Sequence, residues 1–217
     1  MRRISAVLFD LDGVLVESRE ATERVWLDWA SKNGIDAAEL RSAMHGVRSM
    51  EVVRTLRPDL DAVAESARIE RRQTEDTEGL LAIPGAVAAL GALRSDRMAV
   101  VTSGTRPLAR ARLRAVGIEP PAVMVFAGDV ERGKPDPEGY LTATRRLGAD
   151  PAEALVVEDA PPGIEAGRAA GMATVALAST HDADELARAD VVLESLEELP
   201  GLLAARFDAA SVLDLQH

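Results

Sequence analysis

Short apolar runs bounded by turn residues recur along the chain, and each predicts a buried strand. The predicted strands are residues 4–9, 98–101, 123–126, 154–157 and 173–176, with residues 191–193 as a candidate edge strand. A continuous apolar run of this length is typical of a strand covered on both faces of a parallel sheet. Helices are expected between the later runs, at residues 85–93, 107–116, 138–147 and 163–170. Alternating strands and helices indicate an α/β fold with a doubly wound parallel sheet.

Residues 19–78 follow a different pattern. Apolar side chains recur at three- and four-residue spacing over residues 19–32, including Trp26 and Trp29, and predict an amphipathic helix. Further helices are expected at residues 37–43, 50–56 and 60–73. We therefore expect an all-helical cap domain (residues 17–81) inserted into a core (residues 1–16 and 82–217), with hinges near residues 15–18 and 79–84. Residues 208–217 are expected to form a loosely docked tail.

Composition narrows the class of partner. The 217 residues carry 25 Lys and Arg against 36 Asp and Glu, a net charge of −11. A basic surface for nucleic acid or an anionic membrane is therefore not expected. The absence of cysteine excludes disulfides, thiolate metal ligands and cysteine nucleophiles. No apolar stretch approaches the roughly 18 residues of a membrane span and no signal peptide is recognisable, so we expect a cytoplasmic protein, monomeric or weakly dimeric.

Polar side chains lie where the predicted strands end. The groups are Asp10 and Asp12, then Thr102, Ser103 and Gly104, then Lys134 in a loop, and finally Glu158 and Asp159. Each group alone has a plainer explanation, such as a polar turn, a helix N-cap or a solvated lysine. The carboxyl ends of parallel strands meet at one edge of a sheet, where open α/β sheets bind ligands. Their shared position therefore favours one site.

The types of side chain indicate a metal and a phosphate. Carboxylates from two strand ends, with oxygen ligands only, describe a Mg²⁺ site. The hydroxyl and main-chain N–H groups of residues 102–104, at the amino end of a helix, suit phosphate oxygens. Lys134 would offset the charge of the clustered carboxylates and of the phosphate.

Together these segments resemble the four motifs of the haloacid dehalogenase-like phosphohydrolases. The motifs are residues 10–15 (DLDGVL), 100–104 (VVTSG), 133–137 (GKPDP) and 157–164 (VEDAPPGI). The resemblance extends from about residue 4 to residue 195. It implies a Rossmann-like core with a helical cap inserted after the first motif, in agreement with the helical pattern of residues 19–78.

The resemblance also implies catalytic roles. Asp10 would be the nucleophile that forms an aspartyl-phosphate. Asp12 would be the general acid for the leaving oxygen and then the base for the attacking water. Thr102 would bind the phosphate, and Lys134 would hold both Asp10 and the phosphate in place.

For the metal, the resemblance implies Mg²⁺ bound by Asp10, Asp159 and the main-chain oxygen of Asp12. Glu158 would act through water or as a secondary ligand. A carboxylate that attacks a phosphate dianion faces like-charge repulsion, so Mg²⁺ and Lys134 would have to neutralise charge in the transition state.

Two further segments narrow the resemblance to phosphatases of small sugar and polyol phosphates, the group of glycerol-3-phosphatase, 2-deoxyglucose-6-phosphatase and hexitol phosphatase. They are residues 45–49 (HGVRS) and 83–86 (IPGA); Pro162 departs from the group's usual small residue, a change expected to be harmless. We expect His45, Gly46 and Arg48 to face the closed site and contact substrate. The alternatives are cap packing for His45 and a solvated helix start for Arg48. Trp26 and Trp29 could stack on a sugar, but their spacing favours the cap core.

The sequence thus predicts a Mg²⁺-dependent phosphatase that hydrolyses a small sugar or polyol phosphate through an aspartyl-phosphate. The dehalogenase branch lacks an acid equivalent to Asp12. A β-phosphoglucomutase-like mutase is the first alternative, but such enzymes carry a cap histidine where this chain has Thr22. A catalytically idle phosphosugar-binding protein is the second alternative, because a fold alone does not fix function. The sequence does not identify the sugar.

Overall fold

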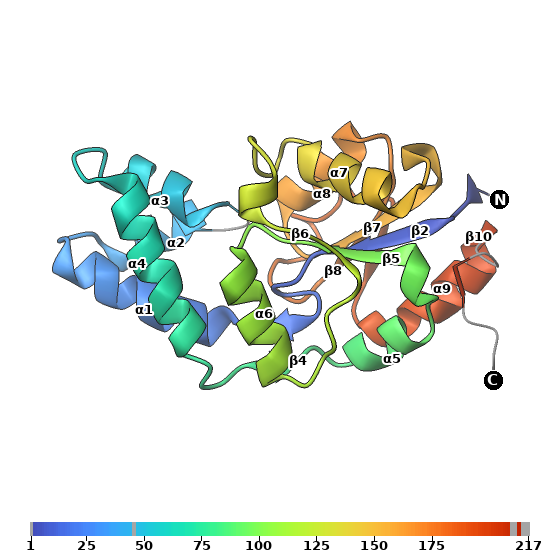
Figure 1. Cartoon of the computed structure of the whole chain (residues 1–217), viewed down its shortest axis with the longest axis horizontal. Coiled ribbons are helices and arrows are strands. Elements are labelled where there is room, and N and C mark those ends of the chain that lie inside the picture. The colour runs from blue at the N-terminus through green and yellow to red at the C-terminus, as the bar shows by residue number, and fades with distance from the viewer. Residues whose placement is uncertain (1, 45–46, 209–211, 214–217) are drawn as a thin grey trace.

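A parallel six-stranded sheet forms the centre of the computed structural model, which describes residues 2–44, 47–208 and 212–213 (Figure 1). Its strands are β2 (Ala6–Phe9), β5 (Met98–Val101), β6 (Val123–Val125), β7 (Ala154–Glu158), β8 (Ala173–Leu177) and β9 (Val191–Leu193). All neighbours are parallel, in the order β6-β5-β2-β7-β8-β9. The order reverses direction at β2, which places the end of that strand at the switch point of a Rossmann-like sheet. The predicted fold class is confirmed.

Helices cover both faces of this sheet (Figure 1). They are α7 (Glu138–Leu147) and α8 (Pro161–Ala169) on one face, and α5 (Ala86–Gly91), α6 (Arg106–Ala115) and α9 (Leu199–Arg206) on the other. Successive strand side chains point to opposite faces. In β2, Ala6 and Leu8 therefore pack in one core cluster with Tyr140, while Val7 and Phe9 join the other. Both faces of β2 are fully buried, which explains its uninterrupted apolar run.

The cap consists of α1 (Arg19–Lys32), α2 (Ala37–Met44), α3 (Ser49–Leu56) and α4 (Ala62–Glu75). It has its own apolar core, in which the rings of Trp26 and Trp29 meet at 87° with centroids 5.4 Å apart. The expected all-helical insertion is confirmed. The chain enters and leaves the cap through β3 (Val16–Glu17) and β4 (Leu81–Ala82), which pair antiparallel. The domain bounds and the hinges expected near these strands stay predictions.

Several short elements were not predicted. They are α9, β1 (Arg2–Arg3) paired with β10 (Phe207–Asp208), the β3–β4 pair, and the 3₁₀ turns Ser95–Arg97, Ala127–Asp129, Pro151–Glu153 and Leu196–Glu198. Two-residue strands and single turns are too short to show a period, and α9 begins with Leu-Pro-Gly, a weak helix-forming segment. None of the described helices is both long and apolar enough to cross a membrane.

The loosely docked tail expected from residue 208 is wrong for the residues that are described there. The main-chain oxygen of Asp208 accepts a hydrogen bond from the Ile4 N–H at 2.9 Å. Val212 is fully buried, and its main-chain oxygen accepts from the Arg94 N–H at 2.8 Å. These contacts dock residues 208 and 212 against the core.

Candidate active site

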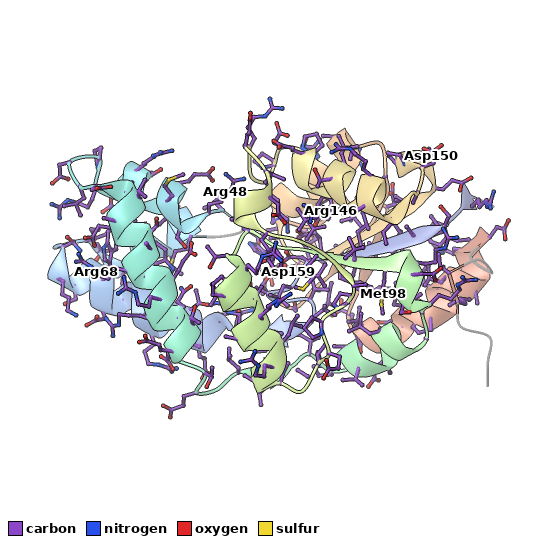
Figure 2. All side chains as sticks on the ribbon, in the orientation of Figure 1. Arg48, Arg68, Met98, Arg146, Asp150 and Asp159 are labelled. Atoms are coloured by element: carbon purple, nitrogen blue, oxygen red, sulfur yellow. The ribbon has the colours of Figure 1, made fainter. Side chains whose placement is uncertain are left out.

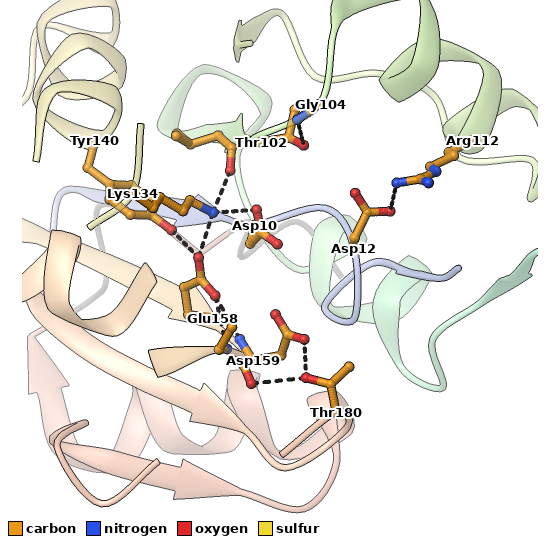
Figure 3. Close-up of polar contacts among 12 residues, drawn as sticks. Asp10, Asp12, Thr102, Gly104, Arg112, Lys134, Tyr140, Glu158, Asp159 and Thr180 are labelled. Carbon is orange, nitrogen blue, oxygen red and sulfur yellow. Dashed lines mark hydrogen bonds and ion pairs between the residues drawn. The ribbon is translucent and has the colours of Figure 1, made fainter. Parts of the chain in front are cut away.

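Asp10 and Lys134 form the centre of the site (Figure 3). Strand β2 ends at Phe9, so Asp10 follows at the middle of the sheet edge, and only 8% of its surface is exposed. Lys134 lies in the loop before α7 and places its Nζ 2.5 Å from Asp10 Oδ1. The same Nζ donates to the main-chain oxygen of Val101 at 3.3 Å. The two residues predicted to share the site therefore meet as a buried ion pair.

Glu158 holds Lys134 from the other side. Its Oε1 accepts from Lys134 Nζ at 2.5 Å and from the Tyr140 hydroxyl at 2.9 Å, and its Oε2 accepts from the main-chain N–H groups of Asp159 and Ala160. Gly163 makes room for this carboxylate, because a Cβ there would lie 1.7 Å from Glu158 Oε1. Glu158 thus acts in this structure as a positioning residue for Lys134, and Tyr140 is a partner that the sequence analysis missed.

Asp159 lies against the turn that follows β2 and contains Gly13. Gly13 has φ +80°, and a Cβ at this residue would lie 2.1 Å from Asp159 Oδ2, so both the backbone and the close approach require glycine. The Thr180 hydroxyl donates to Asp159 Oδ2 and, at 3.1 Å, to the Asp159 main-chain oxygen. Thr180, like Tyr140, was not anticipated.

The acidic cluster fits a cation. One carboxylate oxygen from each of Asp10, Glu158 and Asp159 lies within 4.8 Å of the others, and all three residues are buried. Burial raises the pKa of Asp10 from 3.8 to about 7, with Glu158 and Asp12 adding to the rise and Lys134 opposing it. Burial, then Glu158 and Asp10, likewise raise the pKa of Asp159 well above its usual value. Clustered acids of this kind are relieved by a bound cation.

Lys134 stays charged at this position. Burial lowers its pKa, but the nearby carboxylates of Asp10 and Glu158 more than offset that effect and hold the pKa well above its usual value. The ammonium group is therefore a fixed positive charge beside Asp10, in surroundings where charges interact more strongly than in water.

The Asp12 side chain points away from Asp10, towards α6 (Figure 3). Asp12 Oδ1 lies 2.5 Å from an Arg112 guanidinium nitrogen, and it accepts from the Ser18 hydroxyl at 2.7 Å. Arg112 is 5% exposed and also donates to the Thr22 hydroxyl of the cap at 2.7 Å. The metal role implied for Asp12 uses its main-chain oxygen and stays a prediction. Arg112 is a third residue that the sequence analysis missed.

The loop after β5 contributes the expected phosphate-binding residues. Thr102 is buried, and its Oγ1 accepts from the Gly104 N–H at 3.0 Å, which leaves the hydroxyl proton of Thr102 available for another acceptor. Thr102, Ser103 and Gly104 all line the same cavity as Asp10, just before α6. Their phosphate-binding role stays a prediction.

A cavity of about 370 Å³ separates this edge of the core from the cap. Its core wall carries Asp10 and Lys134, and its cap wall carries Trp26 and Gln73. The site is thus a cavity between cap and core, with the Asp10–Lys134 ion pair on its core wall.

Arg48 lies between the cap and the core (Figure 2). Its guanidinium donates to the main-chain oxygens of Val130 at 3.1 Å and Glu131 at 3.0 Å, in the loop that leads to Lys134. A Cβ at Gly133 would lie 2.7 Å from Arg48 Nε. Arg48 therefore joins cap and core here, and its predicted substrate contact stays a prediction. His45 and Gly46, also predicted to contact substrate, lie outside the described residues.

The chain is similar to known proteins over most of its length. A sequence model of the haloacid dehalogenase-like hydrolases matches residues 4–171. Hexitol phosphatase A of Escherichia coli K12 is 41% identical over 202 residues, which cover 91% of this chain and 94% of that protein. Glycerol-1-phosphate phosphohydrolase 2 of Saccharomyces cerevisiae is 35% identical over 214 residues, covering 91% of this chain and 84% of that protein.

A solved structure of a hydrolase from Pseudomonas syringae superposes with a TM-score of 0.81 at 26% identity, over 94% of this chain and 99% of that one. The chain belongs to the haloacid dehalogenase-like hydrolases, and the resemblance seen in its motifs is confirmed.

Proposed function

We propose that this protein is a Mg²⁺-dependent phosphatase that hydrolyses small sugar or polyol phosphates through an aspartyl-phosphate on Asp10. The observation that carries the proposal is the Asp10–Lys134 ion pair, which lies beside Asp159 on the core wall of the cavity. The names of the relatives, a hexitol phosphatase and a glycerol-1-phosphate phosphohydrolase, support this substrate class.

In the first step an Asp10 carboxylate oxygen attacks the phosphorus, and the bond from phosphorus to the substrate oxygen breaks. Asp12 gives a proton to the departing oxygen, for which it must leave Arg112. In the second step Asp12 takes a proton from water, which attacks the phosphorus and releases phosphate from Asp10.

Lys134 carries the positive charge that this chain itself supplies for both steps. Its ammonium group balances the negative charge that moves from Asp10 onto the phosphoryl oxygens. Mg²⁺ held by Asp10 and Asp159, with the main-chain oxygen of Asp12, would supply further charge neutralisation for the phosphate. Thr102 would donate its hydroxyl proton to a phosphoryl oxygen.

A panel of sugar and polyol monophosphates tests the proposal, with phosphate release measured in Mg²⁺ and in a chelator. We expect release that depends on Mg²⁺ and is highest for small, polyhydroxylated substrates. Conversion between phosphate isomers without release would instead identify a mutase, against which Thr22 argues. A protein that binds these phosphates but leaves every one unchanged would be the idle binding protein.

We propose further that the enzyme acts on small molecules alone, as a monomer or weak dimer in the cytoplasm. The net charge of −11 supports the absence of a nucleic-acid partner. Light scattering on the purified protein measures its mass in solution, and a stable tetramer or larger assembly would contradict this statement.

A further inference from the structure

Gln73 is a buried polar residue at the cap wall of the cavity. It continues the inward-facing positions Ala62, Ser66 and Ile69 of α4, so its place in the helix pattern is that of a core residue. Only 5% of its surface is exposed, and it lines the cavity that contains Asp10. Among the residues that the structure describes, its side-chain amide forms no hydrogen bond. A polar amide at the cavity wall needs a ligand or water as its partner, whereas Leu or Met would serve in a cap built only for packing.

The arginines that line the cavity are already paired. Arg41 lies 2.5 Å from Glu23, and Arg112 lies 2.5 Å from Asp12. Arg19 donates to the main-chain oxygen of Ser179 at 2.6 Å. These are the arginines among the described residues that line the cavity. Among the described residues, a second phosphate on the substrate would therefore meet no unpaired arginine at the cap end.

Apart from Arg19, Arg41, Glu17 and Glu23, the described cap residues that line the cavity are uncharged. Met44, Val47 and Val52 give this wall apolar surface, and Gln73 offers one acceptor and two donors, the combination that a hydroxyl group can satisfy in either role. An apolar surface with a few placed polar groups is the usual construction of a small-molecule site. This end of the cavity therefore suits an uncharged, hydroxylated chain.

We propose that Gln73 is the cap residue that hydrogen-bonds a hydroxyl of the substrate's uncharged tail, and that the substrate carries a single phosphate. This inference rests on the proposed phosphatase function and specifies its substrate class. Gln73 would determine specificity without contacting the phosphorus, because Asp10 and Lys134 lie on the opposite wall.

The test compares two substrates, sorbitol 6-phosphate, which has a hydroxylated tail, and p-nitrophenyl phosphate, which has none. Gln73→Met keeps the length of the side chain and removes the amide. We expect kcat/KM to fall about tenfold for sorbitol 6-phosphate, the loss of one hydrogen bond, and less than about twofold for the aryl phosphate. Ser66→Ala, on the same helix but away from the cavity, should change neither value.

Binding gives a second readout that needs no turnover. Sorbitol 6-phosphate is titrated into Asp10→Asn and into Asp10→Asn with Gln73→Met, and the tryptophan fluorescence, to which Trp26 at the cavity wall and its neighbour Trp29 contribute, is followed. We expect about tenfold weaker binding in the second protein.

Three outcomes would overturn the inference. Equal losses on both substrates would show that Gln73 only supports the fold, and unchanged values would show that it contacts no substrate. A bisphosphate that is a better substrate than the corresponding monophosphate would contradict the proposal that the cap end binds an uncharged part of the substrate. If the parent protein releases phosphate from no substrate at all, the proposed function itself fails. If it does release phosphate, but Gln73→Met leaves the ratio of kcat/KM for sorbitol 6-phosphate to kcat/KM for p-nitrophenyl phosphate unchanged, only this inference fails.

Discussion

The two walls of the cavity are built in opposite ways. On the core wall the side chains of the catalytic candidates form hydrogen bonds or ion pairs with neighbouring residues. The carboxylate of Glu158, which positions Lys134, accepts four hydrogen bonds. On the cap wall, Gln73 has no hydrogen-bonding partner among the described residues, and apolar side chains such as Met44 and Val52 lie beside the same cavity. A reaction centre gains from groups fixed before the substrate arrives. A recognition surface gains from polar groups that the substrate itself satisfies. The comparison therefore indicates that residues of the core carry out the reaction, whereas residues of the cap recognise the substrate.

The largest predicted effect on the chemistry of the core wall comes from removing the nucleophile. Asp10→Asn keeps the shape of the side chain but cannot form the acyl-phosphate, so we expect phosphate release to fall at least about 1,000-fold. Release is measured on the best substrate of the panel. Turnover at the parent rate in Asp10→Asn would contradict the mechanism at its first step.

The tight packing of the core wall predicts a large effect at Gly163. Gly163→Ala would drive a methyl group into Glu158, so we expect a loss of about 3 kcal/mol in the free energy of unfolding. Gly201→Ala in α9 is the matched control, because nothing lies within 4 Å of its Cβ position. Thermal or urea unfolding measures both variants. Equal stabilities of the two would show that the Glu158 pocket is looser than its geometry indicates.

The clustered acids of the core wall predict a pH dependence in the metal-free protein. The folded state raises the pKa of Asp10 to about 7, so the stability from its protonation is complete below pH 3.8 and is lost as the pH rises through 7. Between pH 5.5 and 8 we expect a loss on the order of 2 kcal/mol. Melting temperatures in a chelator measure it.

Two controls sharpen this measurement. Asp10→Asn should flatten the pH dependence, and Mg²⁺ should raise the melting temperature at pH 8, because a ligand that binds only the folded state stabilises it. A melting temperature in chelator that rises or stays constant between pH 5.5 and 8 would contradict the raised pKa of Asp10 in the folded, metal-free protein.

The smallest predicted effect lies where the two walls meet, at Arg112. Arg112→Met removes both the pairing with Asp12 and the hydrogen bond to Thr22 of the cap. We expect about a tenfold lower kcat/KM, because the cap loses the contact with Arg112 that positions it against the core. Arg114→Ala, an exposed position on the same helix, should be neutral. Equal activities of the two variants would remove Arg112 from the site.

The core wall was largely accessible from sequence. Asp10 and Lys134 meet as predicted, and Asp159 lies beside them, because strand ends of a parallel sheet share an edge. Arg112 was missed although a signal existed. It lies on the buried face of α6 with Leu108 and Leu113, an unusual place for a guanidinium. Tyr140 and Thr180 had no comparable local signal.

The cap wall was much less accessible. The pattern of α1 correctly placed Trp26 and Trp29 in the cap core, but did not show that Trp26 also reaches the cavity. Arg48 bonds the main chain of the Lys134 loop in this structure, a contact the sequence did not indicate, and its expected contact with substrate stays a prediction. Gln73 gave no motif at all, because one polar residue in an amphipathic helix is ordinary in a sequence.

The amino-acid sequence by itself determined the α/β class, the helical insertion and the edge of the sheet where the acids gather. These follow from periodicity and from the chirality of strand connections, which are local properties of the chain. Only the tertiary structure decided that Asp12 pairs with Arg112, that Arg48 forms hydrogen bonds with the main chain of the core and that Gln73 lines the cavity. Such pairings depend on how the cap settles against the core through many weak contacts distant in sequence, and no local pattern records them.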